Sequence, residues 1–310
     1  MPGKKPIIVV GSINLDLVAV TERIPAVGET VLGLDFQIHP GGKGANQAVA
    51  VARLGYPVCM IGRLGNDAFG SQLRTHLQSV GVDLSGVATS PGASGVAVIE
   101  VSSKGENSII VAPGANAKVT PQDVTDNLGI IRQAGMVLTQ LEIPLETVEH
   151  LASVCARENV PLILDPAPAR ELPKAILEKT QWLTPNELEA AFYSSGHSLP
   201  SAQIAQSILA NGCRGVILKL GSQGVYLTSR DGVDEFVPAF RVKAVDTTAA
   251  GDAFNGAFAV GLMLGKSPQQ SAVFGAAVAA ISVTRVGAQP AMPTMAEVAS
   301  FLHENSTICL

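Results

Sequence analysis

The sequence predicts a doubly wound α/β fold: a mostly parallel β-sheet between layers of helices, with a small β-sheet lid. Two observations support this prediction. Short apolar runs, each ending in a loop, alternate with helix-like stretches along most of the chain. The runs are continuously apolar instead of alternating with polar residues, which is typical of strands buried on both faces of a parallel sheet. They lie at residues 6–12, 57–65, 134–142, 160–166, 181–187 and 215–221.

Helical patterns fill the spaces between several of these strands, at residues 45–54, 71–80, 145–158 and 201–211. Residues 30–39 break the alternation because they have strand-like content without a following crossover helix. Residues 94–101 and 108–112 flank a turn-rich connection typical of a hairpin. We expect a β lid built from about residues 15–40 and 94–112, within a single domain that spans residues 1–310.

Composition excludes several classes of partner and location. Charged residues make up only 15% of the 310 residues, the net charge is −5, and no cluster of lysine and arginine is present. Nucleic acid and anionic membranes are therefore poor partners. No apolar run approaches the ~18 residues that a membrane span needs. The cysteines, at positions 59, 155, 213 and 309, form no CxxC pair, which favours reduced thiols and a cytoplasmic protein.

The strongest functional pattern lies at residues 244–258, AVDTTAAGDAFNGAF. We expect a strand to end at 242–245, the small residues Ala249, Ala250 and Gly251 to turn the chain, and a helix to follow. Small residues at a helix start leave backbone N–H groups open to an anion, and the helix dipole adds attraction. Asp252 could simply cap this helix. Beside an anion site, however, a carboxylate is repulsive unless it has a task such as accepting a hydroxyl proton.

A second pattern is the glycine-rich stretch PGGKGANQ at residues 40–47, which leads into a helix. Lys43 and Asn46 supply polar groups suited to sugar hydroxyls, although an ordinary glycine-rich loop is an equal alternative for this stretch alone. Neither glycine cluster has the GxGxxG spacing of dinucleotide-binding proteins. The segment Gly265-Lys266-Ser267 resembles the end of a P-loop, but its upstream glycine is out of step and it follows a helix.

Polar residues at other strand ends are candidates because ligands bind at the carboxyl ends of strands in such sheets. Asn14 and Asp16 follow the first strand, Asn186 and Glu189 follow another, and residues 220–224 end a third. Each also has a structural interpretation, as a turn former or a helix N-cap. The five histidines are scattered, which gives no support to a metalloenzyme.

From end to end, the chain resembles the ribokinase-like (PfkB) family of carbohydrate kinases. The resemblance rests on GGKGANQAVAVARLG with GRLGNDAFG, on PNELE, and on DTTAAGDAFNGAF, in that order along the chain. Within the family, GSINLD, DPAPAR and RVGAQPAMP resemble kinases of a free pentose. The resemblance implies transfer of the γ-phosphate of ATP to the 5-hydroxyl of D-ribose, giving ribose 5-phosphate and ADP in ribose catabolism.

The resemblance also implies roles for individual residues. Asp252 would be the catalytic base, and the anion hole would comprise Ala249, Ala250, Gly251 and Asp252. The sugar would contact Asn14, Asp16, Gly41, Gly42, Lys43, Gly44, Asn46, Glu142 and Asp252. ATP would contact Asn186, Lys219, Gly221, Ser222, Gly224, Gly251 and Asp252, with Glu189 acting indirectly on Mg²⁺. A monovalent cation, usually K⁺, would lie near Asp246, Thr248, Ser282, Arg285, Gly287 and Ala291.

Four positions depart from the family pattern: Ala249 stands where glycine is common, Lys219 where threonine or serine is, Asp165 where asparagine is, and Ala291 where serine is. We expect the anion hole to survive because Ala249 is small. We also expect the helix dipole to keep Asp252 ionised, as a weak base, and the lid to be shared with a second subunit in a homodimer.

Three alternatives to this function remain. The nearest is another kinase of the same family, acting on deoxyribose, a nucleoside or a ketohexose such as fructose. A nicotinamide-dependent dehydrogenase shares the layered sheet, but the absence of GxGxxG counts against it. A non-catalytic sugar-binding protein would have no use for Asp252 beside an anion site.

Overall fold

A computed structural model describes residues 3–194 and 199–305, and it has the predicted α/β architecture. Its large sheet follows the order β13-β12-β11-β10-β9-β8-β1-β4-β5, and only the β11–β12 and β12–β13 pairs are antiparallel. The strands are β1 (Ile7–Val10), β4 (Val58–Gly65), β5 (Asp83–Ser90), β8 (Met136–Thr139), β9 (Leu162–Leu164), β10 (Trp182–Leu183), β11 (Gly215–Lys219), β12 (Gly224–Ser229) and β13 (Asp234–Pro238).

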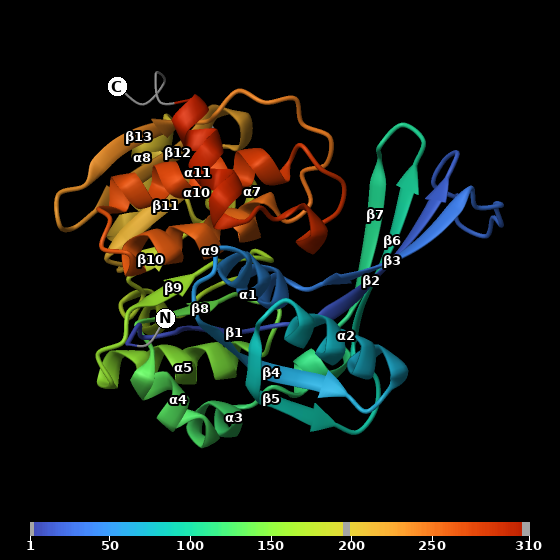
Figure 1. Ribbon diagram of the computed structural model, residues 1–310, viewed down its shortest axis with the longest axis horizontal. Coiled ribbons are helices and arrows are strands. Elements are labelled where there is room, and N and C mark those ends of the chain that lie inside the picture. The colour runs from blue at the N-terminus through green and yellow to red at the C-terminus, as the bar shows by residue number, and fades with distance from the viewer. Residues whose placement is uncertain (1–2, 195–198, 306–310) are drawn as a thin grey trace.

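Two helical layers cover the two faces of this sheet (Figure 1). One layer comprises α1 (Lys43–Arg53), α2 (Ala68–Ser79), α9 (Ala250–Met263), α10 (Pro268–Ser282) and α11 (Met295–Glu304). The other comprises α3 (Pro121–Asp126), α4 (Leu128–Gln133), α5 (Leu145–Arg157), α6 (Lys174–Leu177), α7 (Glu187–Tyr193) and α8 (Ser201–Ala210). Short 3₁₀ turns occur at η1 (Gly114–Lys118), η2 (Gly221–Gln223) and η3 (Gln289–Ala291).

Strand β1 shows why a continuously apolar run predicts this arrangement. Ile7 and Val9 pack into the core beneath α1 and α9, whereas Ile8 and Val10 pack into the core beneath α5. All four side chains are fully buried. Because successive side chains of a strand point to opposite faces, both sets must be apolar when both faces are covered.

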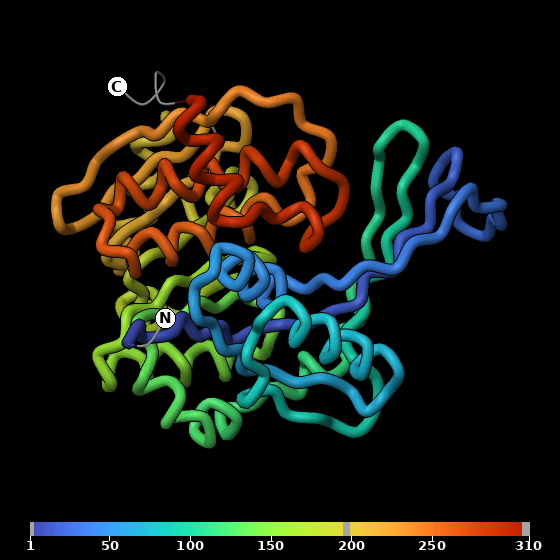
Figure 2. The backbone as a smooth tube through the Cα atoms, in the orientation of Figure 1, coloured from blue at the N-terminus to red at the C-terminus, as the bar shows by residue number. Residues whose placement is uncertain are grey.

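The lid is a separate four-stranded mixed sheet in the order β3-β2-β6-β7. Its strands are β2 (Asn14–Thr21), β3 (Asp35–Gly41), β6 (Gly95–Ser102) and β7 (Asn107–Ala112). The backbone trace in Figure 2 shows both hairpins projecting together from the body, with β2 leaving it directly after β1. The lid therefore begins at the carboxyl end of a central strand, beside the expected ligand site.

The six strands and four helices predicted from the sequence are confirmed, with shifts of a few residues at their ends. Three local expectations are wrong. Residues 242–245 form no strand: β13 ends at Pro238, and the Val245 N–H instead donates to the carbonyl oxygen of Val283 at the end of α10. The strand expected from residue 30 begins only at Asp35. Asn14 and Asp16 lie on β2 and not in a turn.

Among the described residues, no helix is long and apolar enough to cross a membrane. Cys59, Cys155 and Cys213 are buried free thiols, and burial raises the pKa of Cys155 to about 12. Cys309 lies outside the described residues. The cytoplasmic location and the single-domain organisation both stay predictions.

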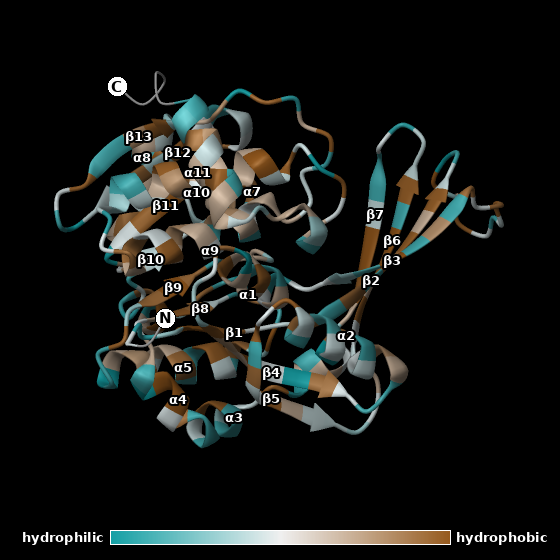
Figure 3. Cartoon of the chain, viewed as in Figure 1, coloured by the Kyte–Doolittle hydropathy of each residue, from teal (hydrophilic) through white to brown (hydrophobic). Residues whose placement is uncertain are grey.

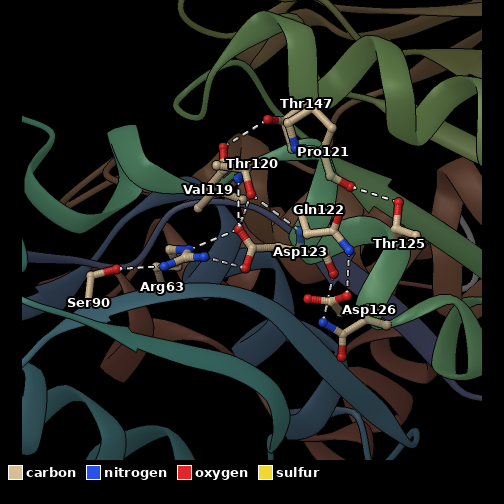
Figure 4. A network of polar contacts seen from close by, with 11 residues as sticks. Arg63, Ser90, Val119, Thr120, Pro121, Gln122, Asp123, Thr125, Asp126 and Thr147 are labelled. Carbon is tan, nitrogen blue, oxygen red and sulfur yellow. Dashed lines mark hydrogen bonds and ion pairs between the residues drawn. The ribbon is translucent and has the colours of Figure 1, made fainter.

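A partly buried ion pair fastens α3 to the large sheet, as Figure 4 shows. Arg63 of β4 donates from Nε and Nη2 to the two carboxylate oxygens of Asp123, at 2.9 and 2.7 Å. Asp123 also completes a capping box with Thr120 at the start of α3. Burial opposes ionisation of Asp123, but the hydrogen bonds from Arg63 and Thr120 outweigh it and lower the pKa.

We predict that Asp123→Asn lowers the free energy of unfolding by about 2–4 kcal/mol, because Arg63 loses its bidentate partner. Urea unfolding measures the change, and Asp126→Asn, on the exposed side of the same helix, is the matched control. Asp123 contributes stability while it is ionised, so the difference between variant and wild type should shrink as the pH falls below the ordinary carboxyl range. A loss equal to that of the control would contradict the prediction.

Candidate active site

A pocket of about 430 Å³ opens at the carboxyl ends of the central strands of the large sheet. Its lining comes from the segments after β9, β10 and β11 and from the starts of α1, α7 and α9. The predicted residues that line it are Lys43, Asn186, Glu189, Lys219, Gly221, Ala249, Ala250, Gly251 and Asp252. The pocket therefore lies at the edge of the sheet where the sequence predicts a ligand site.

Helix α9 begins at this pocket in an unusual backbone conformation. Its N-cap residue, Ala249, is left-handed with φ 59° and ψ 14°, a region that disfavours residues with a Cβ atom. The first intrahelical bond runs from the Ala253 N–H to the Ala249 carbonyl oxygen, at 2.9 Å. The N–H groups of Gly251 and Asp252 therefore have no partner within the helix and are available to an anion.

Asp252 does not cap α9, so its structural interpretation is wrong. Its side chain is 4% exposed and accepts two hydrogen bonds from other side chains, and no side-chain hydrogen bond caps the start of α9. Asn46 Nδ2 donates to Asp252 Oδ2 at 3.0 Å, and Gln47 Nε2 donates to Asp252 Oδ1 at 3.1 Å. Both donors lie on α1, which packs against α9. The carboxylate is thus held by side chains from another helix.

Burial raises the pKa of Asp252 to about 6, against the opposing effect of the Lys43 ammonium group. The Asp165 carboxylate raises the pKa further, whereas the hydrogen bonds from Asn46 and Gln47 lower it. The expectation that the helix dipole would make Asp252 a weak base is therefore wrong, because desolvation is the largest effect. A carboxylate with a pKa near 6 is mostly ionised at pH 7 and is better matched to proton transfer.

Beside Asp252, the glycine-rich loop, β2 and the segment after β8 converge. Glu142 Oε2 accepts hydrogen bonds from Ser12 Oγ at 2.5 Å and from the Lys43 N–H at 3.1 Å. Gly42 has φ 87°, and a Cβ atom there would lie 2.7 Å from the backbone nitrogen of Asn14, so this close approach of α1 to β2 requires glycine. The expected sugar-binding side chains are brought together.

The charged side chains around Lys43 change one another's pKa, although Asp16 and Glu142 are not among the residues that line the pocket. Burial, together with Glu142 and Asp252, raises the pKa of Asp16 to about 6. Burial opposes the charge of Lys43, but the surrounding carboxylates outweigh it and raise the pKa of the ammonium group. Lys43 is thus a fixed positive charge among acids. Asn14 differs from the other predicted sugar residues, because its Oδ1 accepts a 2.6 Å hydrogen bond from buried Asn116.

The opposite end of the pocket carries the residues expected to bind ATP. Asn186 and Glu189 form the capping box of α7, so the N-cap interpretation of Asn186 is confirmed, although the residue also lines the pocket. Lys219 Nζ lies 3.0 Å from Asp165 Oδ1. The same ammonium group lies close to Gly251, since a Cβ atom added to that glycine would be 3.3 Å from Nζ. The two family departures, Lys219 and Asp165, therefore form one ion pair beside the start of α9.

Three of the residues expected at a monovalent cation lie together. Asp246 Oδ1 accepts from the Thr248 N–H at 2.9 Å and from its hydroxyl at 2.6 Å, while Oδ2 accepts from the Gly287 N–H at 2.8 Å. The other side chains bond elsewhere: Ser282 Oγ donates to the Ala279 carbonyl, and Arg285 pairs with Glu297. Ala291 is buried in η3.

Several residues of the site were not among the predicted site residues. Gln47 stands within the glycine-rich motif and Asp165 stands directly after a strand, so the sequence position of each could have indicated a site residue. Gln289 lies within RVGAQPAMP but was given no role there, and Asn116 is a lone amide in a segment of ordinary composition; only the folded chain brings the two to the site.

A buried carboxylate lies beside an open helix start, at the edge of the sheet where the strands end and next to a β lid. This combination is typical of a phosphotransferase that acts on a hydroxyl group. The family model described as "pfkB family carbohydrate kinase" matches residues 4–295. The chain therefore belongs to the pfkB family of carbohydrate kinases.

Individual relatives agree with this assignment. Ribokinase of Bacillus subtilis is 42% identical over 297 residues, which cover 96% of this chain and 99% of that protein. Deoxyribokinase of Salmonella typhi is 35% identical over 304 residues, covering 96% and 99%. The structure of Arabidopsis thaliana ribokinase complexed with ribose and ATP superimposes with a TM-score of 0.91 at 37% identity, covering 96% of this chain and 99% of that one.

We predict that Ala249→Gly raises the free energy of unfolding by up to about 1 kcal/mol, because glycine adopts the left-handed conformation without a Cβ penalty. Chemical denaturation measures the gain. Ala253→Gly, four residues further along α9 in ordinary helical backbone, is the matched control and should be destabilising. A loss of stability in Ala249→Gly would show that the conformation of Ala249 carries no strain.

Proposed function

We propose that this carbohydrate kinase transfers the γ-phosphate of ATP to the 5-hydroxyl of D-ribose. The observation that carries the proposal is Asp252, a buried carboxylate with a raised pKa held directly beside the open amides of the α9 start. An acceptor hydroxyl placed between the carboxylate and those amides would have a base for its proton and a cradle for the incoming phosphoryl group.

The mechanism follows from these positions. Asp252 accepts the proton of the sugar hydroxyl as that oxygen attacks the γ-phosphorus in line, and the bond to the ADP oxygen breaks. The N–H groups of Gly251 and Asp252 stabilise the negative charge on the transferring oxygens. The ammonium group of Lys219, beside Gly251, adds positive charge at the same place. The lid, whose β2 carries Asp16, excludes water that would otherwise compete as acceptor.

Ribose is favoured because paired polar groups gather around Lys43 and Asp252, the two predicted sugar residues that line the pocket. Asp16, Lys43 and Glu142 lie together there, and Asn46 Nδ2 has a second hydrogen beyond the one donated to Asp252. A site built to pair hydroxyls penalises a sugar that lacks one, because its buried groups are left unsatisfied. Deoxyribose is the nearest alternative, in line with the Salmonella relative.

Two ions complete the proposal. The described residues hold no cluster of three histidine, cysteine or carboxylate side chains able to bind a metal alone. Mg²⁺ would therefore arrive with ATP, facing Glu189 and Asp165, and would neutralise phosphate charge during transfer. Asp246 suits a K⁺ ion because hydrogen bonds from Thr248 and Gly287 outweigh its burial and lower its pKa, so the carboxylate stays ionised. Such an ion would order the loop before α9.

The proposed substrate is tested by measuring ADP release with ATP and Mg²⁺ over a panel of ribose, 2-deoxyribose, fructose and nucleosides. We predict the highest kcat/KM for ribose, and a lower rate when K⁺ is replaced by a bulky organic cation. Equal or better use of 2-deoxyribose would overturn the ribose assignment. Identical rates with and without K⁺ would overturn the cation site.

We also propose that the back of the lid pairs with a second copy of this chain. Ile38, Leu17, Val98 and Ile110 are neighbours in register across the four lid strands. Asp16, the next residue to Leu17, belongs to the opposite face, so this apolar row faces away from the sugar residues. Ile38, Val98 and Ile110 are 43%, 41% and 68% exposed, and Figure 3 shows apolar stretches along these projecting strands. Such a surface is expected to be covered by a partner.

We predict a dimer at micromolar concentration in analytical ultracentrifugation and a shift toward monomer in the double variant Val98→Lys/Ile110→Lys. Asn107→Lys, exposed on the opposite face of β7, is the matched control. A wild-type protein that sediments only as a monomer would contradict the proposal.

A further inference from the structure

A continuous line of hydrogen bonds connects the carboxylate of Asp252 to a histidine on α2. Asn46 Nδ2 donates to Asp252 Oδ2 at 3.0 Å, and Asn46 Oδ1 accepts from Gln289 Nε2, also at 3.0 Å. Gln289 Oε1 in turn lies 2.8 Å from His76 Nε2. The four residues come from α9, α1, η3 and α2, so no local sequence motif contains them.

The direction of this line is fixed by its end. An ionised carboxylate can only accept, so the Asn46 nitrogen must face Asp252 and the Asn46 oxygen must face Gln289. Gln289 must then present its nitrogen to Asn46 and its oxygen to His76. The His76 ring must therefore carry a hydrogen on Nε2. Each amide orientation is thereby consistent with that of the residue before it in the line, beginning at Asp252.

The part of this hydrogen-bonded line that lies nearest to Asp252 is buried. Asn46 is 6% exposed and Gln289 is 3% exposed, while His76 is partly exposed. Inside a protein, an amide that loses one partner leaves a buried polar atom unsatisfied and can rotate. A rotated Asn46 would turn its oxygen toward the carboxylate. That orientation disfavours ionised Asp252.

We propose that Gln289 and His76 are positioning residues for phosphoryl transfer: they hold the Asn46 amide with its nitrogen toward Asp252, and so keep the carboxylate ionised and correctly aimed. The inference rests on the proposed function, because it assigns Asp252 the role of base. Neither residue needs to touch the sugar or ATP. The loop after α10, which carries Gln289, is thereby coupled to the reacting end of the pocket.

Other groups also affect the pKa of the Asp252 carboxylate, and a variant of Gln289 or His76 should leave their effects unchanged. Lys43 on α1 faces it as a cation, and Asp165 after β9 faces it as an anion. Asp16 on β2 interacts with it electrostatically. Gln47, held by Gln140 at 2.7 Å, donates to its other oxygen and to Asp165. None of these contacts includes Gln289 or His76, so changes there leave them in place.

The test compares Gln289→Met, which keeps the side-chain length but removes both polar atoms, with Gln78→Met on the exposed side of α2 as control. We expect Gln289→Met to lower kcat about tenfold with little change in the KM for ATP, as is usual when a positioning contact is lost. The pKa of Asp252 should rise, because its donor is no longer fixed. The acid limb of the pH profile of kcat/KM should therefore move to higher pH.

A second pair of variants keeps the test decisive if Gln289→Met does not fold. His76→Leu removes the outer donor, whereas His76→Gln retains an N–H donor. We expect a smaller loss of kcat in His76→Leu and recovery toward wild type in His76→Gln. Equal kcat and equal pH profiles in these two variants would overturn the proposal. So would a Gln289→Met enzyme whose acid limb is unchanged, even if its melting temperature falls.

Failure of the proposed function would be seen separately, as a wild-type protein without turnover on any sugar of the panel. The positioning role would then be tested without catalysis. Carboxyl ¹³C NMR of aspartate-labelled protein gives the pKa of Asp252, whose signal is identified by its absence in Asp252→Asn. A higher pKa in Gln289→Met than in the wild type supports the inference, and an unchanged pKa overturns it.

Discussion

The structure depends on one costly arrangement: the carboxylate of Asp252 is almost completely removed from water in an apolar α/β body. An isolated buried charge would protonate or destabilise the fold. Here two amides from α1 donate to it, Lys43 supplies an opposite charge, and the open start of α9 adds a favourable dipole. The compensation is incomplete, because the pKa remains raised. The chemical result is a carboxylate whose pKa is raised to about 6.

The fold brings these groups together because parallel strands end at one edge. Asp165 follows β9, Asn186 follows β10 and Lys219 ends β11, while the lid begins shortly after β1. Four acidic side chains and two lysines line the pocket, and the ion pair of Lys219 with Asp165 lies beside the start of α9, where we propose that the phosphate chain of ATP binds. The same edge therefore brings Lys43 and Asp252, which we propose contact the sugar, into one pocket with Asn186 and Lys219, which we propose contact ATP.

The sequence predicts the sheet and the pocket edge well because burial on both faces demands continuous apolar strands, as β1 shows. Two kinds of feature escape it. Ala249 adopts a left-handed conformation that its residue type disfavours, and only tertiary packing holds it there. Gln289 reaches Asn46 across more than 240 positions of the chain, and the segment RVGAQPAMP that contains it does not indicate this contact. Desolvation of Asp252 was likewise underestimated, because it depends on helices that are distant in sequence.

The central claim, that Asp252 is the base for phosphoryl transfer, is tested most directly by kcat, ATP affinity and melting temperature of Asp252→Asn. Asparagine keeps the size of the side chain but cannot accept the proton. We predict that kcat falls by about 10²–10⁴, the range for loss of general base catalysis. ATP affinity should be kept or slightly increased, because a negative charge near the γ-phosphate is removed. Wild-type turnover at an unchanged melting temperature would contradict the account.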